Sequence, residues 1–341
     1  MAHRDIIVIG ASAGGVEALR AVVSGLSPSI PAALCVVLHV PPGSPSALPA
    51  ILARAAPVPV RAAVDGEPLR QGRIYVAPAD RHLLIIDHRV RLSRGASENG
   101  HRPAIDPLFR SAAYTFGPRT VGVVLSGTRD DGAGGLLAIA QRGGVAIVQD
   151  PDDALHPSMP RSALDLVRTE HVLPAAKIGP LLSELARSEV PEGPADDDPT
   201  LAAEVAMSDM APLTTDEFFN EPAGFGCPAC GGALYELPSA KIPRYRCRVG
   251  HAWAPESLLE EQAAGLEGAL WTALRVLEER AALAERLVIG SAAGGGAHET
   301  RYRKAADDAL QTASTIRALI ESIGVAVDGR SIAPTGRQRS R

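Results

Sequence analysis

Short apolar runs recur through the first half of the chain, and the first of them leads directly into a segment with helical spacing. Each run contains almost no polar residue, which is typical of strands that are buried on both faces of a parallel sheet. We therefore predict an α/β domain over residues 1–188, built on a doubly wound, mostly parallel sheet in a Rossmann-like three-layer arrangement. The clearest predicted strands are Ile6–Ile9, Ala33–Leu38 and Thr120–Leu125.

The last third of the chain has a different pattern, in which apolar residues recur at helical spacing. A helix is predicted from Pro255 to about Val288. After a Gly/Ala stretch a second helix is predicted to about Ile323, where Gly324 ends it. The two predict an antiparallel helical hairpin over residues 254–325, whose apolar stripes indicate packing, a homo-oligomer interface or a signalling partner. The stripes are Leu259, Leu266, Leu270, Leu274 and Leu277, then Ala305, Ala309, Ala313, Ile316 and Ile320.

Polar residues with catalytic chemistry stand directly after the predicted strands. Ser12 lies within Gly10–Gly14, whose G-x-S-x-G spacing is that of a nucleophile elbow at the start of a helix. His39 closes the second strand, and Asp131 follows the third. Because the carboxyl ends of parallel strands meet at one edge of a sheet, we expect a triad of nucleophile, general base and orienting acid. The alternative is a phosphate-binding glycine turn with a bystander serine.

Five motifs, in order, resemble those of the chemotaxis-type protein-glutamate methylesterase domain, and the resemblance covers about residues 4 to 188. It implies the same triad, with Asp130 as the weaker candidate for the acid. It also implies hydrolysis of γ-glutamyl methyl esters on cytoplasmic helices of methylated chemoreceptors, in signal adaptation, with glutamine deamidation by some members and no cofactor for catalysis. The motifs are Ile9–Gly15, Leu38–Pro41, Ile105–Ala112, Leu125–Ala133 and Pro157–Pro160.

The chain departs from the family pattern at Ala13, where Thr is frequent, and at Thr128–Arg129, where Met is frequent. These changes keep two alternatives open: a catalytically weak or inactive esterase-like scaffold, and a nucleotide-binding α/β module. Family members with a regulatory role usually carry an N-terminal receiver domain. Here the first strand begins at residue 5, so control by aspartyl phosphorylation in cis is not expected.

The family's middle motif contains His101, Arg102 and Asp106. Asp106 is expected either to cap the helix that follows it or to serve the site. Arg102 and Arg129 either attract an acidic receptor helix or are solvated loop residues. The Pro157–Pro160 motif is expected to shape the crevice.

Three cysteines and one histidine have the spacing of a zinc ribbon over residues 223–253. C-x2-C, a spacer of 16 residues and C-x3-H place three thiolates and one imidazole around a tetrahedral ion. All four ligands are protein groups, so we predict a closed, structural Zn²⁺ site; unrelated thiols and a redox Cys-x-x-Cys are the alternatives. The predicted ligands are Cys227, Cys230, Cys247 and His251. Basic residues in the ribbon favour a solvated or protein-docking face, with nucleic acid less favoured.

The remaining segments are predicted from composition. Residues 189–222 are acidic and rich in proline, which predicts a linker, and residues 326–341 predict a disordered basic tail. A ribbon beyond such a linker is expected to unfold on chelation while the esterase keeps its activity. The net charge of −5 disfavours nucleic acid as the main partner. Without a signal-peptide pattern or an apolar stretch of ~20 residues, we expect a cytoplasmic protein that does not insert into a membrane.

Overall fold

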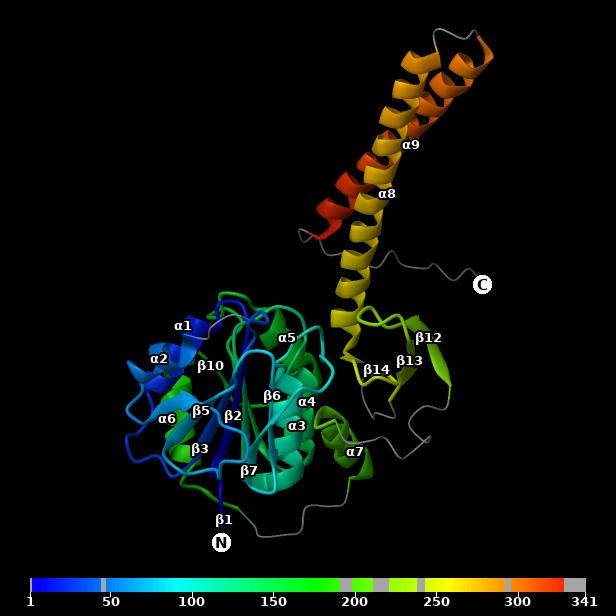
Figure 1. The fold of residues 1–341 in the computed structure, drawn as a ribbon. Coiled ribbons are helices and arrows are strands. Elements are labelled where there is room, and N and C mark those ends of the chain that lie inside the picture. The colour runs from blue at the N-terminus through cyan, green and yellow to red at the C-terminus, as the bar shows by residue number, and fades with distance from the viewer. Residues whose placement is uncertain are drawn as a thin grey trace, which may run out of the picture. The chain divides into compact units, whose positions relative to one another are not determined.

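The protein forms two compact units, Met1–Leu259 and Glu260–Arg341, and the boundary between them falls within one helix. Figure 1 shows the order of the elements along the chain. The computed structural model describes residues 2–43, 47–190, 198–210, 221–237, 243–291 and 296–327. The predicted tail from residue 328 onward, and residues 191–197 and 211–220 of the predicted linker, lie outside the described residues.

A sheet of seven strands, all parallel to their neighbours, forms the centre of the first unit, as the sequence predicts. The order across the sheet is β10-β9-β8-β2-β3-β5-β4. The first strand of the sheet in the chain is β2, and β3, β4 and β5 follow on one side of it. The next strand, β8, pairs with the other side of β2, and β9 and β10 continue the sheet in that direction. The order therefore reverses between β2 and β8, which is the switch point of a doubly wound sheet. The strands are β2 (Ile6–Ala11), β3 (Ala33–Leu38), β4 (Val60–Ala62), β5 (Arg73–Val76), β8 (Thr120–Val124), β9 (Val145–Gln149) and β10 (Val172–Leu173).

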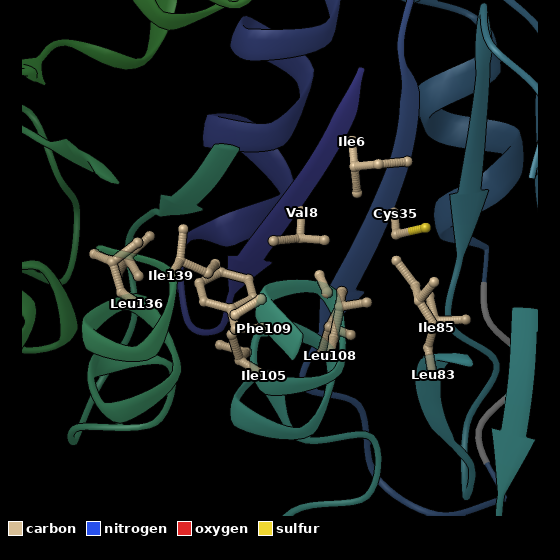
Figure 2. Close-up of a cluster of buried hydrophobic side chains, with 14 of the residues drawn as sticks. Ile6, Val8, Cys35, Leu83, Ile85, Ile105, Leu108, Phe109, Leu136 and Ile139 are labelled. Carbon is tan, nitrogen blue, oxygen red and sulfur yellow. The ribbon is translucent and has the colours of Figure 1, made fainter. Parts of the chain in front are cut away.

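Helices cover both faces of this sheet (Figure 1). Ile6 and Val8 of β2 belong to the buried cluster that includes α3 and α4, which Figure 2 shows. Ile7 and Ile9 belong to the opposite cluster, with α1, α2 and α6. Because successive strand residues point to opposite faces and both faces are covered, every position of β2 is buried, hence the unbroken apolar runs. The helices are α1 (Gly15–Ser24), α2 (Leu48–Ala53), α3 (Ile105–Phe116), α4 (Ala133–Gln141), α5 (Ser158–Leu166) and α6 (Ala175–Leu185).

Smaller elements complete the core of the first unit. β6 (His82–Ile86) and β7 (Arg89–Ser93) form an antiparallel pair, whose Leu83 and Ile85 pack in the same cluster as α3 (Figure 2). A short 3-10 helix, Gly117–Arg119, leads from α3 into β8. β1 (Ala2–His3) pairs with β11 (Glu189–Val190), which joins the two ends of the predicted catalytic segment.

The predicted linker contains a helix that packs on the core. α7 (Pro199–Ser208) begins where the Asp198 carboxylate accepts a hydrogen bond from the Leu201 N–H at 2.9 Å. Leu201, Val205 and Met207 are buried, and Leu201 belongs to the same cluster as α3 and α4. This part of the linker is therefore ordered against its neighbour.

After the linker comes an antiparallel sheet of four strands, here called the small sheet, in the order β12-β13-β14-β15. Its core is small: Leu234, Trp253 and Leu258 pack with two of the predicted metal-binding cysteines. Such a core is too small to stabilise a domain by itself. The strands are β12 (Pro222–Gly226), β13 (Ala233–Glu236), β14 (Tyr245–Cys247) and β15 (Ala252–Trp253).

In the second unit, α8 (Pro255–Ser291) and α9 (Ala297–Val327) pack against each other. Two members of the predicted leucine stripe, Leu259 and Leu266, are instead 69% and 53% exposed. The predicted end at Gly324 is wrong, because α9 continues to Val327; one glycine costs a helix only about 1 kcal/mol. The residues that pack are Leu270, Leu274, Leu277, Ala313, Ile316 and Ile320.

Candidate active site

Ser12 lies in the turn between β2 and α1, at the carboxyl edge of the sheet. Its N–H donates to the Ser126 carbonyl at 2.9 Å, which ties the turn to the end of β8. Gly14 has φ 70°, in the left-handed region that favours glycine. A Cβ at Gly10 would collide with the Ile105 side chain, so glycine there lets α3 approach β2. Gly14 is thus required by its backbone conformation, and Gly10 by the close approach of α3.

His39 stands between the other two predicted triad residues. Its Nδ1 lies 3.1 Å from Ser12 Oγ, and its Nε2 lies 2.7 Å from Asp131 Oδ2. The side chain of His39 is 5% exposed and that of Asp131 is 1% exposed. Because an ionised carboxylate only accepts, Nε2 carries the proton donated to Asp131, and Nδ1 is the acceptor that faces the Ser12 hydroxyl. The fold thus brings together all three residues that the strand ends predict.

Asp131 accepts hydrogen bonds from four donors. Oδ2 accepts from His39 and from the Ile105 N–H at 2.7 Å. Oδ1 accepts from the Asn99 side-chain amide at 3.0 Å and from the Asp106 N–H at 3.2 Å. Burial alone would raise the pKa of Asp131, but the hydrogen bond and charge of His39 and the Ile105 N–H lower it well below the usual value. The carboxylate is therefore ionised at neutral pH and suited to orient His39.

Asp130, the weaker candidate for the acid, has other partners. Its carboxylate accepts from the Ser257 hydroxyl and from the Glu256 N–H at 3.2 Å, both in the first turn of α8. Burial raises the pKa of Asp130 to about 6. Of the two neighbouring carboxylates, Asp131 is the one bonded to His39.

Asp106 caps a helix, but not the helix in which it lies. It stands in the first turn of α3, and its Oδ1 accepts from the Gly132 N–H at 3.1 Å and the Gly135 N–H at 2.6 Å. Those amides begin α4, so the expected cap of the helix after Asp106 is wrong. A local sequence pattern shows only the nearest helix, whereas the fold brings the start of α4 within reach. Burial and the charge of Asp131 raise the pKa of Asp106 to about 6.

His101 covers one face of His39. The two ring centroids lie 3.7 Å apart, with 14° between the planes. Burial, followed by the charge of His39, lowers the pKa of His101 to about 4, so it is neutral at physiological pH. A neutral ring stacked on His39 restrains the ring plane without repelling the protonated base.

Two further motif residues have structural partners. Arg102 donates to Asp80 at 2.6 and 2.9 Å and to the Gly95 carbonyl at 2.9 Å, which favours a loop-holding role over one in attracting substrate. Met159 is fully buried, and its N–H donates to the Gly127 carbonyl at 3.0 Å. A Cβ at Gly127 would lie within 3 Å of both Ser12 and Met159, so the Pro157–Pro160 motif packs behind the nucleophile.

Asn99 was not among the predicted site residues, yet it is 2% exposed and its side-chain amide donates to Asp131. Its φ of 52° is left-handed, a conformation that Asn adopts more readily than most residues. The Asn99-Gly100 pair signals a turn in sequence. That signal does not show where the side chain points, because its partner Asp131 lies in the turn between β8 and α4.

The four predicted metal ligands also come together. Their donor atoms all lie within 4.8 Å of one another. Cys230 Sγ lies 3.7 Å from Cys247 Sγ, and Cys247 Sγ lies 3.5 Å from His251 Nδ1. Around a tetrahedral zinc ion, with Zn–S of about 2.3 Å and Zn–N of about 2.0 Å, these separations are about 3.8 and 3.5 Å. The donor set fits zinc in chemistry and in size.

A doubly wound parallel sheet, with Ser, His and Asp linked at its switch point, defines an α/β protein with a hydrolase-type site. The family model for CheB methylesterase matches residues 7–182, and the chain belongs to this family. A protein-glutamate methylesterase/protein-glutamine glutaminase 2 of Anaeromyxobacter dehalogenans is 41% identical over 186 residues, 54% of either chain. One of Pseudomonas aeruginosa is 40% identical over 192 residues, 55% of either chain. The chain thus spans about half the length of the curated relatives it matches.

Among solved structures, the CheB methylesterase catalytic domain of Thermotoga maritima is similar, with 33% identity and a TM-score of 0.52. The match covers 54% of this chain and all of the other. In the part of the chain that the structure describes, no helix combines the length and the apolar character that crossing a membrane requires.

Proposed function

We propose that this protein is a protein-glutamate methylesterase that hydrolyses γ-glutamyl methyl esters on the cytoplasmic helices of methylated chemoreceptors. The observation that carries this proposal is the hydrogen-bonded chain from Ser12 Oγ through His39 to the buried Asp131. Membership of the methylesterase family supports the reaction class. The names of the relatives support the glutamate ester as substrate and glutamine deamidation as a second reaction. Since the proposed substrate helices are cytoplasmic, the protein acts there, in signal adaptation.

In the proposed reaction, Ser12 Oγ attacks the ester carbonyl carbon while its proton passes to His39 Nδ1. Asp131 stabilises the resulting imidazolium through Nε2. The tetrahedral intermediate expels methanol, which takes the proton from His39. Water then attacks the acyl-enzyme and gives a proton to His39. The second tetrahedral intermediate releases the glutamate side chain, and the departing Ser12 Oγ takes the proton back from His39. With a glutamine substrate the same steps release ammonia.

The oxyanion of each tetrahedral intermediate needs a hydrogen-bond donor beside Ser12. We assign this role to the Ala13 N–H, which follows Ser12 and lies two residues before α1 begins, near the end of the helix where the dipole favours negative charge. The site uses protein groups alone for these steps. A phosphate-binding role for the Gly10–Gly14 turn would leave the contact between His39 and Ser12 without a purpose.

Methanol release from a methylated receptor fragment tests the proposal. Release by the wild-type chain, abolished in Ser12→Ala, supports the methylesterase. A wild-type chain that binds the fragment without releasing methanol would instead support the scaffold. Stabilisation of the chain by a nucleotide, with no reactivity at Ser12, would support the nucleotide-binding module.

We also propose that Cys227, Cys230, Cys247 and His251 hold a structural zinc ion in a zinc ribbon. The separations between the donor atoms support this proposal. Four protein ligands leave no open position for substrate. We expect one zinc ion per chain in elemental analysis of the purified protein. Metal-free protein with three freely titratable thiols in this cluster would rule the site out.

For the second unit we propose a helical hairpin that pairs with a second copy of the chain. The support is a set of large apolar side chains that remain exposed on α8: Trp271, Leu283 and Leu287, at 53%, 59% and 42%. We expect a dimer in light scattering and a monomer for Trp271→Glu. A wild-type chain that stays monomeric at high concentration would contradict pairing and leave a signalling partner as the alternative.

A further inference from the structure

The small sheet contacts the residue that orients the triad acid. The Asn99 N–H donates to the Ala252 carbonyl at 2.8 Å, and the Ala254 N–H donates to Asn99 Oδ1 at 2.8 Å. Since Oδ1 is used as an acceptor there, Nδ2 faces Asp131, to which it donates at 3.0 Å. Asn99 therefore links β15, through its backbone, and Ala254, through its side chain, to the carboxylate bonded to His39.

A buried ion cluster holds the same loop from the other side. Glu98 pairs with Arg110 of α3 at 2.5 Å and with Arg246 of β14 at 2.9 Å, and all three side chains are at most 2% exposed. Arg246 also donates to the Gly250 carbonyl at 2.9 Å, within the loop that carries the predicted metal ligands. Removing either arginine would leave the buried Glu98 charge with one partner fewer, so the position of the loop depends on α3 and β14 together.

These contacts lie next to the predicted metal site in the chain. Arg246 directly precedes Cys247, and Ala252 directly follows His251. The Cys247 N–H donates to the His251 carbonyl at 3.0 Å, which closes the loop between them. A sheet with so small an apolar core would depend on the proposed zinc ion for folding. Loss of the metal would therefore release the backbone that holds Asn99.

We propose that the small sheet is a positioning element of the triad, and that Asn99 is the positioning residue through which it acts. The metal takes no part in the chemistry, yet the esterase depends on it, because the metal-folded sheet holds the Asn99 amide against Asp131. The inference rests on the esterase function proposed above. It adds that ester hydrolysis depends on metal at a site outside the triad.

Zinc removal from the full chain is the first test. The kcat and KM for hydrolysis of a small γ-glutamyl methyl ester peptide are measured before chelation, after chelation and after zinc is added back. One hydrogen bond to a charged group corresponds to a loss of about 10- to 100-fold in kcat. KM should change less than about twofold, because Asn99 is buried and acts through Asp131. A kcat that stays within about twofold in the zinc-free chain would overturn the proposal.

Proton NMR gives a readout that does not depend on turnover. The His39 Nε2 proton lies in the hydrogen bond to Asp131, so its resonance reports that contact. We expect the resonance to move or broaden on zinc removal and to return with zinc. If the zinc-loaded chain shows no Ser12-dependent hydrolysis but the resonance still responds, the methylesterase proposal fails and the positioning role stands. An unchanged resonance would overturn the positioning role.

Two variants separate positioning from general unfolding. Asn99→Gly removes the amide at a position whose φ of 52° glycine accepts. It should lower kcat about as much as zinc removal does in the wild type, and zinc removal should then add less than about threefold. Arg248→Ala is the matched control: Arg248 follows Cys247 but donates to Tyr235 within the small sheet, and the variant should retain kcat. The same loss on zinc removal in Asn99→Gly as in the wild type would overturn the role of Asn99.

Discussion

At the scale of the residue, the proposed chemistry depends on how one imidazole, that of His39, is held. Ser12 and Asp131 contact the two nitrogens of His39, and His101 covers a face of the ring. The four donors on Asp131 keep this acid ionised, so the charge needed to stabilise a protonated His39 is present before substrate binds. The ring lies with Nδ1 toward Ser12, so Nδ1 is the atom that would receive the Ser12 proton in the proposed reaction.

Triad variants should lose turnover without losing the fold. Ser12→Ala, His39→Ala and Asp131→Asn should each lower kcat for methanol release by at least about a thousandfold, because the three residues act as one unit. Ser24→Ala removes an exposed hydroxyl that bonds only within its own helix, and this control should keep wild-type activity. Near-normal release by any of the three triad variants would contradict the role of that residue.

Asp130 should make stability fall as pH rises. Burial raises its pKa to about 6, above the unfolded value of about 3.9, so the folded state holds the proton more tightly. Protonated Asp130 therefore contributes fully to the free energy of unfolding below the pKa of the unfolded state. This contribution is lost as the pH rises through the pKa of the folded state. Against Asp130→Asn, which cannot ionise, the wild type should lose on the order of 2 kcal/mol of unfolding free energy between about pH 4 and pH 7. Urea denaturation measures this difference, and parallel pH profiles would contradict it.

At the scale of the element, the Glu98 ion cluster joins parts of the chain that are far apart in sequence. Arg110 comes from α3 and Arg246 from β14, and Ser208 of α7 donates to Glu98 at 2.8 Å. Glu204 of α7 also pairs with Arg244. The helix in the predicted linker and the small sheet are thereby held to the core by buried polar contacts.

Breaking this cluster should be costly. Glu98→Ala leaves two arginines without their carboxylate in a buried site, and we expect a loss of about 3 kcal/mol or more in unfolding free energy. Arg91→Ala serves as the comparison, because Arg91 pairs with Asp65 and Asp209 while its own side chain is 46% exposed, and it should lose about 1 kcal/mol or less. Equal losses in the two variants, measured by chemical denaturation, would show that the cluster contributes no more than a surface pair.

At the scale of the whole molecule, the first compact unit extends beyond the predicted catalytic segment. The first unit includes the small sheet and the start of α8, and it ends at Leu259, well beyond residue 188. If the predicted ribbon and the predicted catalytic segment were separate modules, they would function independently. The contacts of Asn99 and Glu98 join them instead.

Two truncations test this division. A chain ending at Leu259 should hydrolyse a small ester peptide within about twofold of the full chain, because it keeps the contacts behind Asp131. A chain ending at Ser188 should lose about tenfold or more in kcat, since it lacks the partners of Asn99 and Glu98. Differences between the full chain and the longer fragment should appear only on assembled receptors, where the second unit adds effective concentration. Equal activity of the two fragments would support independent folding and function of the catalytic segment and the small sheet.

The local patterns that predicted correctly share one property: their physics is contained in a few neighbouring residues. Unbroken apolar runs predicted the buried parallel strands, and positions directly after them predicted the convergence of Ser12, His39 and Asp131. The spacing of the cysteines and the histidine predicted which four residues would cluster. The triad roles, the zinc ion and the divisions of the chain beyond the sheet stay predictions.

The sequence by itself determined the class of sheet and the residues that gather at its carboxyl edge, because parallel strands bring their ends together whatever the loops contain. Only the tertiary structure decided which helix Asp106 caps, that Asn99 faces Asp131, and that Glu98 meets Arg246. Those contacts join residues 29 to 148 positions apart along the chain. The physical reason is burial: a charged or amide side chain enclosed in the fold must find a partner there, and local spacing carries no information about which element supplies it.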